Sequence, residues 1–293
     1  MDGIILINKE KNYTSNDVVQ IVKKIFNQKV GHTGTLDPMA TGVLPLLIGK
    51  GTLCSKYLIN HDKIYVTTLK LGVKTDTGDI TGNIIQKKDV DEKCLDLEKI
   101  KNVLNSFKGI QEQIPPMYSA IKVDGKKLYE YARKGQKVDI SPRKINLYNL
   151  ELISVKNNEI CFRVCCSKGT YIRTLCEDIA EKIGTIGTMC ELNREKVGDF
   201  DIENAVTIEQ LKQSCCNLNF LDTHFVNIEK LFESHPKIFL NESNIKKFLN
   251  GVKLSGFSNF KDGLVRIYFE NSFIGIATLK KGVLKRDIVV REV

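Results

Sequence analysis

Hydrophobic and polar positions at the start of the chain change from the spacing of a strand to that of a helix. Residues 3–8 form a short apolar run that ends at polar residues, which is typical of a buried strand. Thr14-Ser15 then offers an N-cap, with Asp17 in the first turn. The apolar residues that follow share one stripe at helical spacing: Val18, Val19, Ile21, Val22, Ile25 and Phe26. We therefore predict a buried strand and then an amphipathic helix that ends near Asn27.

A polar, glycine-punctuated segment separates this helix from the next apolar run. Residues 31–42 carry Pro38 among several glycines, so we expect a loop there, followed by a strand over residues 43–48. Residues 64–69 alternate as a half-buried strand would, before the turn-rich residues 76–79. The loop at residues 31–42 is where chemistry could sit.

The middle of the chain mixes helical and hairpin signals. Apolar residues have helical spacing from Leu97 to Phe107, and Gly109 is the expected stop. Asp124-Gly125 predicts a tight turn, followed by a short basic helix that ends near Gly135. Asn157-Asn158 joins two alternating stretches as a hairpin. Because hairpins and helices are interspersed, we predict an α+β fold rather than a doubly wound parallel sheet.

The character of the chain changes near Pro236. Short strand-like runs broken by glycines predict a small, β-rich domain over residues 235–293, after a larger domain over residues 1–234. The formal net charge is +9, and residues 235–293 hold 11 basic and 5 acidic residues, so most of the excess lies in this tail. A basic tail suggests an anionic partner.

Composition narrows the class of protein. The chain is 42% hydrophobic and 27% charged, which excludes disorder as its main state. Nine cysteines without a Cys-x-x-Cys spacing indicate neither a disulfide framework nor a zinc knuckle, so we expect a reducing, cytoplasmic compartment. We see no signal peptide and no apolar run long enough to span a membrane.

Asp37 is the one acid in the loop at residues 31–42. Pro38 favours an extended conformation of Asp37, and the surrounding glycines allow a ligand to approach the backbone closely. An Asx-type turn, in which Asp37 bonds only to local backbone, explains the same residues. A phosphate loop is excluded because Leu44 stands where the Walker spacing requires glycine, and we find no zinc-protease histidine pair or nucleophile elbow.

The exact order of residues in this loop is more informative than their conformational preferences. Residues 31–45, Gly-His-Thr-Gly-Thr-Leu-Asp-Pro-Met-Ala-Thr-Gly-Val-Leu-Pro, closely resemble the signature of the TruB family of tRNA pseudouridine synthases. Further blocks agree in order: residues 62–65 resemble the family's tyrosine motif, residues 114–133 its RNA-gripping insertion, and residues 167–174 its arginine motif. The resemblance covers most of residues 1–200.

Two places depart from the family pattern. A proline and a glycine usual in the first motif are replaced by Glu10 and Asn12, although asparagine tolerates the left-handed conformation that such a turn needs. The later Leu-Arg-Arg pattern reads Leu192-Asn193-Arg194, which weakens the case for a contact from Asn193.

The resemblance implies a fold as well as an activity. It implies the pseudouridine synthase fold, in which helices flank a mixed, mainly antiparallel sheet. The RNA-gripping insertion would span about residues 110–143. The basic tail is similar to a PUA domain, a small RNA-binding β-barrel.

The resemblance also implies three catalytic residues. Asp37 is the nucleophile, which attacks ribose C1′ or uracil C6 or helps to remove a ribose proton. Arg173, in the first turn of a helix opened near Gly169-Thr170, would lower the pKa of Asp37 and keep it ionised. Tyr65 would stack on the target uracil and help to remove its C5 proton. The isomerisation needs no redox partner, and we expect no cofactor and no metal.

The remaining implied residues bind the substrate. The target base must leave its stack before Asp37 can reach it, and His32 would support the flipped nucleotide by stacking. Lysines and tyrosines of the insertion would grip the RNA. The expected contacts are His32, Thr35, Leu36, Met117, Tyr118, Lys122, Lys126, Lys127 and Leu192. A solvated charge run with ordinary packing aromatics explains the insertion equally well from composition alone.

We therefore predict an isomerase that converts uridine 55 in the T-arm loop of tRNA to pseudouridine. We expect tRNA as the partner, no required protein partner, no membrane, and a monomer. The runner-up enzyme is the guide-RNA-directed relative of H/ACA particles, which lacks most of the insertion. A non-catalytic RNA-binding or tRNA-folding protein on the same scaffold is the alternative from a different class.

Overall fold

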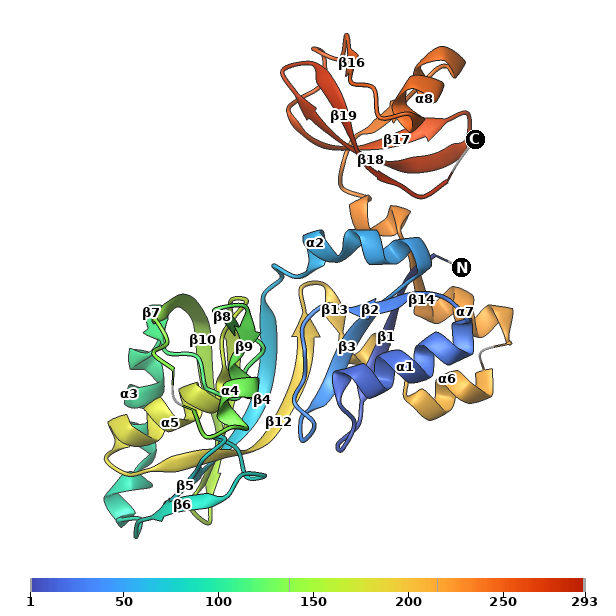
Figure 1. Cartoon of the computed structure of the whole chain (residues 1–293). Helices are drawn as coiled ribbons and strands as arrows, with labels where there is room; N and C mark the ends of the chain where they lie inside the picture. The colour runs from blue at the N-terminus through green and yellow to red at the C-terminus, as the bar shows by residue number, and fades with distance from the viewer. Residues whose placement is uncertain (1, 137, 215, 292–293) are drawn as a thin grey trace.

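The computed structural model describes residues 2–136, 138–214 and 216–291, which form a larger sheet with helices and a smaller β-rich unit above it (Figure 1). In the described residues the larger sheet has ten strands, ordered β14-β1-β3-β12-β4-β11-β10-β7, with β2 paired to β3 and β13 to β12. Their bounds are Gly3–Lys9 (β1), Val30–His32 (β2), Thr41–Ile48 (β3), Lys63–Leu71 (β4), Gly109–Gln113 (β7), Arg143–Lys156 (β10), Glu159–Cys166 (β11), Gly187–Val197 (β12), Phe200–Asp201 (β13) and Phe225–Asn227 (β14). β12 runs parallel to β3 and antiparallel to β4, so the expected mixed, mainly antiparallel sheet is confirmed.

β1 is buried on both faces. Ile5 and Ile7 belong to the main core cluster, whereas Ile4 and Leu6 point into a second cluster on the opposite face of the sheet. A strand covered on both sides has no polar face, which explains the unbroken apolar run in the sequence.

Helices cover the side of the sheet that faces the main core. α1 (Ser15–Phe26), α3 (Leu97–Ser106), α5 (Ile172–Ile183) and α6 (Ile208–Ser214) all contribute buried residues to that core. The other helices are α2 (Ser55–Leu58), α4 (Leu128–Ala132), α7 (Leu218–His224) and α8 (Glu242–Leu249), with 3-10 turns η1 (Gly49–Cys54), η2 (Glu92–Cys94), η3 (Ile202–Asn204) and η4 (Glu229–Phe232). No helix in the described ranges is long and apolar enough to cross a membrane.

Local sequence signals set the ends of several elements. Thr14 caps α1 with a capping box to Asp17, and Asn27 ends the helix in the left-handed conformation, as predicted. Asn157 and Asn158 both adopt positive φ and join β10 to β11, which confirms that hairpin.

Two boundaries differ from the prediction. α3 ends at Ser106, and Gly109 instead opens β7 with a φ of 98°, because the chain turns there into the edge strand of the sheet. The segment at residues 31–42 is not wholly loop, since β2 pairs with β3 and β3 begins at Thr41. β2 has three residues, all half-buried, so its pairing left no alternation in the sequence.

A small hairpin and helix lie next to β10 and β4 (Figure 1). β8 (Lys122–Val123) and β9 (Lys126–Lys127) meet at Asp124-Gly125, both with positive φ, and α4 follows at once. The buried Leu128 anchors this unit. A separate pair, β5 (Val73–Thr75) with β6 (Ile84–Lys87), lies at the far end of the sheet.

The C-terminal unit is a second sheet with its own core. Its described strands are β15 (Lys237–Phe239), β16 (Leu254–Ser255), β17 (Gly263–Phe269), β18 (Ser272–Lys280) and β19 (Val283–Val289), in the order β15-β17-β18-β19-β16. The expected β-rich character is confirmed. α8 was not predicted, although Ile245 and Phe248 lie one turn apart and pack into this core.

The two units touch through a small apolar cluster. Cys54, Phe232 and Ile276 belong to it, so η1, η4 and β18 pack together. Lys56 and Tyr57 both donate to Asp287 of β19, and Lys50 Nζ donates to the Val290 carbonyl at 3.0 Å. The C-terminal unit is therefore seated on the α2 region of the larger one (Figure 1).

Candidate active site

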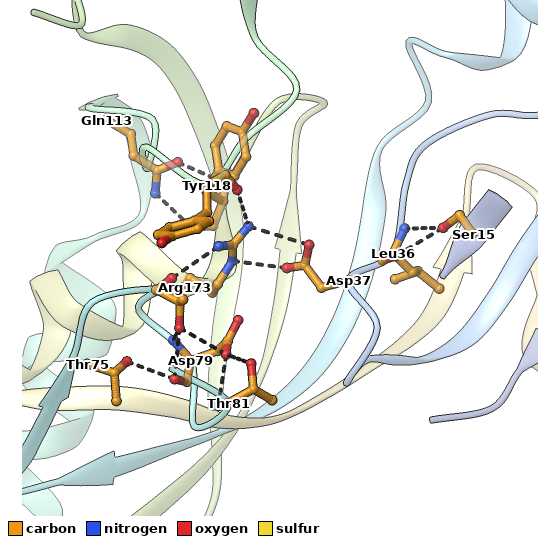
Figure 2. A network of polar contacts seen from close by, with 11 residues as sticks. Ser15, Leu36, Asp37, Thr75, Asp79, Thr81, Gln113, Tyr118 and Arg173 are labelled. Carbon is orange, nitrogen blue, oxygen red and sulfur yellow. Dashed lines mark hydrogen bonds and ion pairs between the residues drawn. The ribbon is translucent and has the colours of Figure 1, made fainter. Parts of the chain in front are cut away.

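Three residues outside the loop that carries Asp37 hold it through hydrogen bonds. The buried Ser15 Oγ accepts from Leu36 N at 2.8 Å and donates to Leu36 O at 3.0 Å, so the start of α1 fixes the residue before the acid (Figure 2). On the other side, Lys9 Nζ donates to Pro38 O at 3.3 Å and Asn12 N to the same oxygen at 2.8 Å. Asn12 adopts a φ of 70°, so the turn expected despite the missing glycine is present.

Asp37 and Arg173 form an ion pair that faces a cavity. Arg173 Nε lies 3.0 Å from Asp37 Oδ2, and Nη2 donates to Oδ1 at 3.4 Å (Figure 2). Arg173 also donates to Thr77 O at 3.1 Å and Tyr118 O at 3.0 Å. The Arg173 side chain is 7% exposed and that of Asp37 is 31% exposed, so the carboxylate is the more accessible of the two groups.

Burial dominates the electrostatics of Asp37. It raises the pKa of the carboxyl above its ordinary value, Arg173 opposes this shift, and Asp79 adds to it. Asp79 is itself buried and accepts from Thr81 N at 3.0 Å. Arg173 thus lowers the pKa of Asp37, as expected, but desolvation outweighs the cation, so the net pKa lies above its ordinary value.

The cavity beside Asp37 has a volume of about 660 Å³. Of the residues expected at the site, it brings together seven: Thr35, Leu36, Asp37, Tyr65, Tyr118, Arg173 and Leu192. Tyr65 lies on β4 and Leu192 on the neighbouring β12, both largely buried. Burial raises the pKa of Tyr65, and Arg194 opposes that shift. The Asx-turn alternative for Asp37 is insufficient, because its carboxylate bonds to Arg173 across the fold.

The other expected residues lie outside the cavity wall. Lys122 and Lys126 are exposed on the β8–β9 hairpin, and Lys127 Nζ lies 5.4 Å from the centroid of the Tyr129 ring. Met117 is half-buried before that hairpin. His32 lies on β2 with a buried, unpartnered Nδ1, and burial lowers its pKa.

Three buried polar residues at the cavity escaped the sequence analysis. Lys63, Arg194 and Ser119 all line it, and Ser119 Oγ has no hydrogen-bond partner among the described residues. Lys63 lies in the block at residues 62–65 that resembles the tyrosine motif, and Arg194 lies in the pattern Leu192-Asn193-Arg194. These two motifs were the sequence signal that could have pointed to both residues. Their burial depends on the distant pairing of β4 with β12, which local periodicity does not report.

In the described part of the chain, no three or more histidine, cysteine, aspartate or glutamate side chains are grouped so that they could hold a metal ion. Among the described residues that line the cavity, Asp37 is instead the one carboxylate, and six side chains are cationic: Lys63, Arg143, Lys144, Lys168, Arg173 and Arg194.

Models of known protein families match the segments of the chain that form this site. The model for the "TruB family pseudouridylate synthase (N terminal domain)" matches residues 23–172, which hold Asp37 and Tyr65. The chain belongs to the TruB family. The model for the "tRNA pseudouridylate synthase B C-terminal domain" matches residues 173–233, and that for "Pseudouridine synthase II TruB, C-terminal" matches residues 236–289.

Relatives in this family match nearly the whole chain. The tRNA pseudouridine synthase B of Clostridium tetani is 44% identical over 96% of this chain and 96% of its own length. That of Francisella philomiragia is 43% identical over 97% and 93%. A solved chain from a Cbf5–Nop10–Gar1 complex is 26% identical, with a TM-score of 0.68 over 99% of this chain and 84% of that one. The expected pseudouridine synthase fold is thereby confirmed.

Proposed function

We infer that the chain converts uridine 55 in the T-arm loop of tRNA to pseudouridine, with Asp37 as the nucleophile. Membership of the TruB family makes it an isomerase that acts on tRNA. The observation that supports Asp37 most strongly is its carboxylate, paired with the buried Arg173 and open to a cavity of about 660 Å³. That volume lies in the range of sites that enclose a small molecule or a single nucleotide.

The reaction rearranges one bond and needs no oxidant or reductant. The C1′–N1 bond breaks, the uracil turns, and C5 bonds to C1′; C5 then loses its proton and N1 gains one. A carboxylate can start this by attack on C1′ or C6, or by removal of a ribose proton. All three routes need Asp37 ionised, and the 3.0 Å contact with Arg173 supports the ionised form against the effect of burial.

Tyr65 and Leu192 supply the walls for the base. Both line the cavity on adjacent strands and are largely buried, which suits an aromatic ring with an apolar residue beside it. We assign stacking on the uracil to Tyr65, and its hydroxyl to removal of the C5 proton.

The other substrate contacts divide between the loop and the insertion. Thr35, Leu36 and Tyr118 line the cavity and would contact the flipped nucleotide. We keep His32 and Met117, which lie outside its wall, as further contacts with the RNA. The exposed Lys122 and Lys126, with Lys127, would hold phosphates while the base leaves its stack. We keep about residues 110–143 as the insertion, within a catalytic domain of residues 1–234 and before an RNA-binding domain of residues 235–293.

We propose that the enzyme acts alone, as a monomer in the cytoplasm, and selects its tRNA without a guide RNA. The structural relative at 26% identity comes from a complex with Nop10 and Gar1, whereas the relatives at 43–44% identity are named as tRNA pseudouridine synthases. The hairpin at Lys122–Lys127 and the helix α4 support the stand-alone form, which grips its own substrate.

A T-arm hairpin incubated with the purified chain tests this function. We expect pseudouridine at position 55 after sequencing-based mapping, with no guide RNA, metal or nucleotide added. A hairpin with cytidine at that position is the control. If the uridine hairpin gains no pseudouridine while tRNA binding is intact, the chain is a non-catalytic RNA-binding protein on this scaffold.

A further inference from the structure

Two cationic side chains are buried at the cavity without an acidic partner in the described part of the chain. Lys63 is 7% exposed and Arg194 is 1% exposed. Among the described residues, no carboxylate oxygen lies within 4.0 Å of either, whereas Arg173 in the same cavity is paired with Asp37. Buried charges in proteins are ordinarily paired, so this arrangement needs another explanation.

Strand pairing brings both cations to Tyr65. Arg194 on β12 stands directly opposite Tyr65 on β4, and Lys63 lies two residues before Tyr65 on the same face of β4. A Cβ atom added at Gly34 would lie 3.5 Å from Arg194 Nη1 and 4.0 Å from Lys63 Cε, so both side chains converge on that glycine. Two like charges therefore sit close together at low exposure.

Main-chain carbonyls hold the two side chains in place without neutralising them. Arg194 Nε donates to Val43 O at 2.9 Å and Nη2 to Gly34 O at 3.1 Å. Lys63 Nζ donates to Ile59 O at 3.4 Å and to the His61 carbonyl. Burial lowers the pKa of Lys63 and Arg194 lowers it further, as expected for a cation held beside another. A negative charge that entered this corner would be stabilised strongly.

The proposed reaction produces such a charge. When the C1′–N1 bond breaks, its electron pair stays with the base, and the uracil carries a negative charge spread over N1, O2 and O4 until C5 bonds to C1′. Tyr65 stands directly opposite Arg194 on the neighbouring strand, and both residues line the same cavity as Asp37. A base that starts at Asp37 and lies over Tyr65 therefore reaches toward Arg194.

We propose that Arg194, with Lys63, stabilises the uracil anion while the base is detached from the ribose. This assignment rests on the proposed function and adds two catalytic residues to it. Fixed donors cost no reorganisation when the charge develops, which is the usual advantage of such groups. Arg194 also fixes Gly34, so the same residue ties the anion-binding corner to the loop of Asp37.

The experiment varies the stability of the uracil anion that forms when the C1′–N1 bond breaks. T-arm hairpins carry uridine or 5-fluorouridine at the target position, because fluorine at C5 stabilises the uracil anion. The rate is measured at saturating enzyme, in a single turnover, as loss of the N1-bonded nucleotide. We expect Arg194→Gln to lower it by about 10²–10³-fold on uridine, and at least about tenfold less on 5-fluorouridine. Arg194→Lys, which keeps the charge, should recover part of the loss.

Lys63→Gln repeats the test without disturbing the contact to Gly34, and it decides the matter if Arg194→Gln does not fold. Arg163→Gln is the matched control: Arg163 lies on the neighbouring β11, is paired with Glu195 at 2.9 Å, and is exposed. It should leave both rates unchanged.

Two outcomes would overturn the proposal. Equal losses on both hairpins would mean that the cations only hold the fold of the loop. Weaker RNA binding with an unchanged saturated rate would mean that they bind a phosphate instead. Failure of the proposed function is distinct, because the unsubstituted enzyme would then leave both hairpins unreacted.

Discussion

The loop of Asp37 lines the cavity, and the β8–β9 hairpin lies between residues 118–121 and Tyr129, which line the same cavity, but the loop and the hairpin are built differently. The loop is fixed by buried contacts from Ser15, Lys9 and Arg194 to three of its residues. The hairpin has two-residue strands, exposed lysines and a tip at Gly125 with open space around it. The chemical group is held rigidly, whereas the groups expected to grip RNA are left free to adjust.

This difference follows from what each region must do. A desolvated carboxylate acts only at fixed geometry, since a small displacement changes the barrier steeply. Phosphate contacts depend on charge and counterion release, which tolerate variation in position. Substitutions should therefore affect the rate on bound RNA in the first region, and affinity and salt dependence as well in the second.

The largest expected effect comes from Asp37→Asn. It keeps the size of the side chain but removes the proposed nucleophile, so the single-turnover rate should fall by at least about 10³-fold. Filter binding of tRNA should change little. Appreciable pseudouridine formation, with deamidation back to aspartate excluded by mass spectrometry, would contradict the role of Asp37.

Arg173→Gln should rank next, with a loss of about 10²–10³-fold. Burial already raises the pKa of Asp37 and Arg173 opposes it, so removing the cation raises that pKa further. The ionised form reacts, so the rate falls as pH falls through this pKa, and the acidic limb of the pH–rate profile should move to higher pH in the variant. An unshifted limb would show that Arg173 only positions the loop; Arg163→Gln is the control.

Much of the first region could be predicted from the sequence. Thr14, Asp17 and Asn27 set the ends of α1 through local chemistry, and the motif around Asp37 marked the loop. Lys9, Lys63 and Arg194 could not be predicted as buried, because lysine and arginine ordinarily lie at the surface. Their burial comes from strands far apart in the chain, such as β12 between β3 and β4.

The net effect on the pKa of Asp37 was beyond the sequence for the same reason. An adjacent arginine predicts a lower pKa, but the degree of desolvation depends on how completely the fold surrounds the acid. α8 was missed for a different reason: the glycine-broken strand pattern around it dominated the interpretation of residues 235–293. Its two anchors, Ile245 and Phe248, make too short a stripe to stand out.

Neutralising the hairpin lysines should give a moderate effect on two measurements. Lys122, Lys126 and Lys127 changed together to Gln should weaken tRNA binding by about tenfold and reduce its salt slope by up to about three. The saturated rate should also fall if these residues hold the RNA while the base is exposed, as we propose. A triple change to Gln at Lys87, Lys93 and Lys101, which are exposed and do not line the cavity, is the matched control. If the saturated rate of the hairpin variant is unchanged, these lysines do not take part in the step that exposes the base.

The C-terminal unit should affect binding alone. Deleting it would uncover the apolar cluster around Phe232 and Ile276, so surface substitutions are the cleaner experiment. Lys253, Lys280 and Lys285 are exposed, and changing all three to Gln should weaken binding a few-fold and flatten the salt dependence. The saturated rate should stay the same. If that rate falls as much as it does in the variant of Lys122, Lys126 and Lys127, the two basic regions do not differ in their effect on the reaction.

The smallest effect is expected where the two units meet. Asp287 accepts from Lys56 and Tyr57 and is 20% exposed, so Asp287→Asn removes a partly solvated charge from a contact that links α2 to β19. Its loss should lower the free energy of unfolding by about 1 kcal/mol in urea titrations of the full chain. Glu242→Gln, in an exposed pair with Lys246, should change it by less than about 0.5 kcal/mol. Neither variant should alter the saturated rate, because the contact lies away from the loop of Asp37. If Asp287→Asn slows the reaction on bound RNA, the seat of the C-terminal unit helps to set the catalytic geometry, and the loop of Asp37 is not fixed by its own contacts alone.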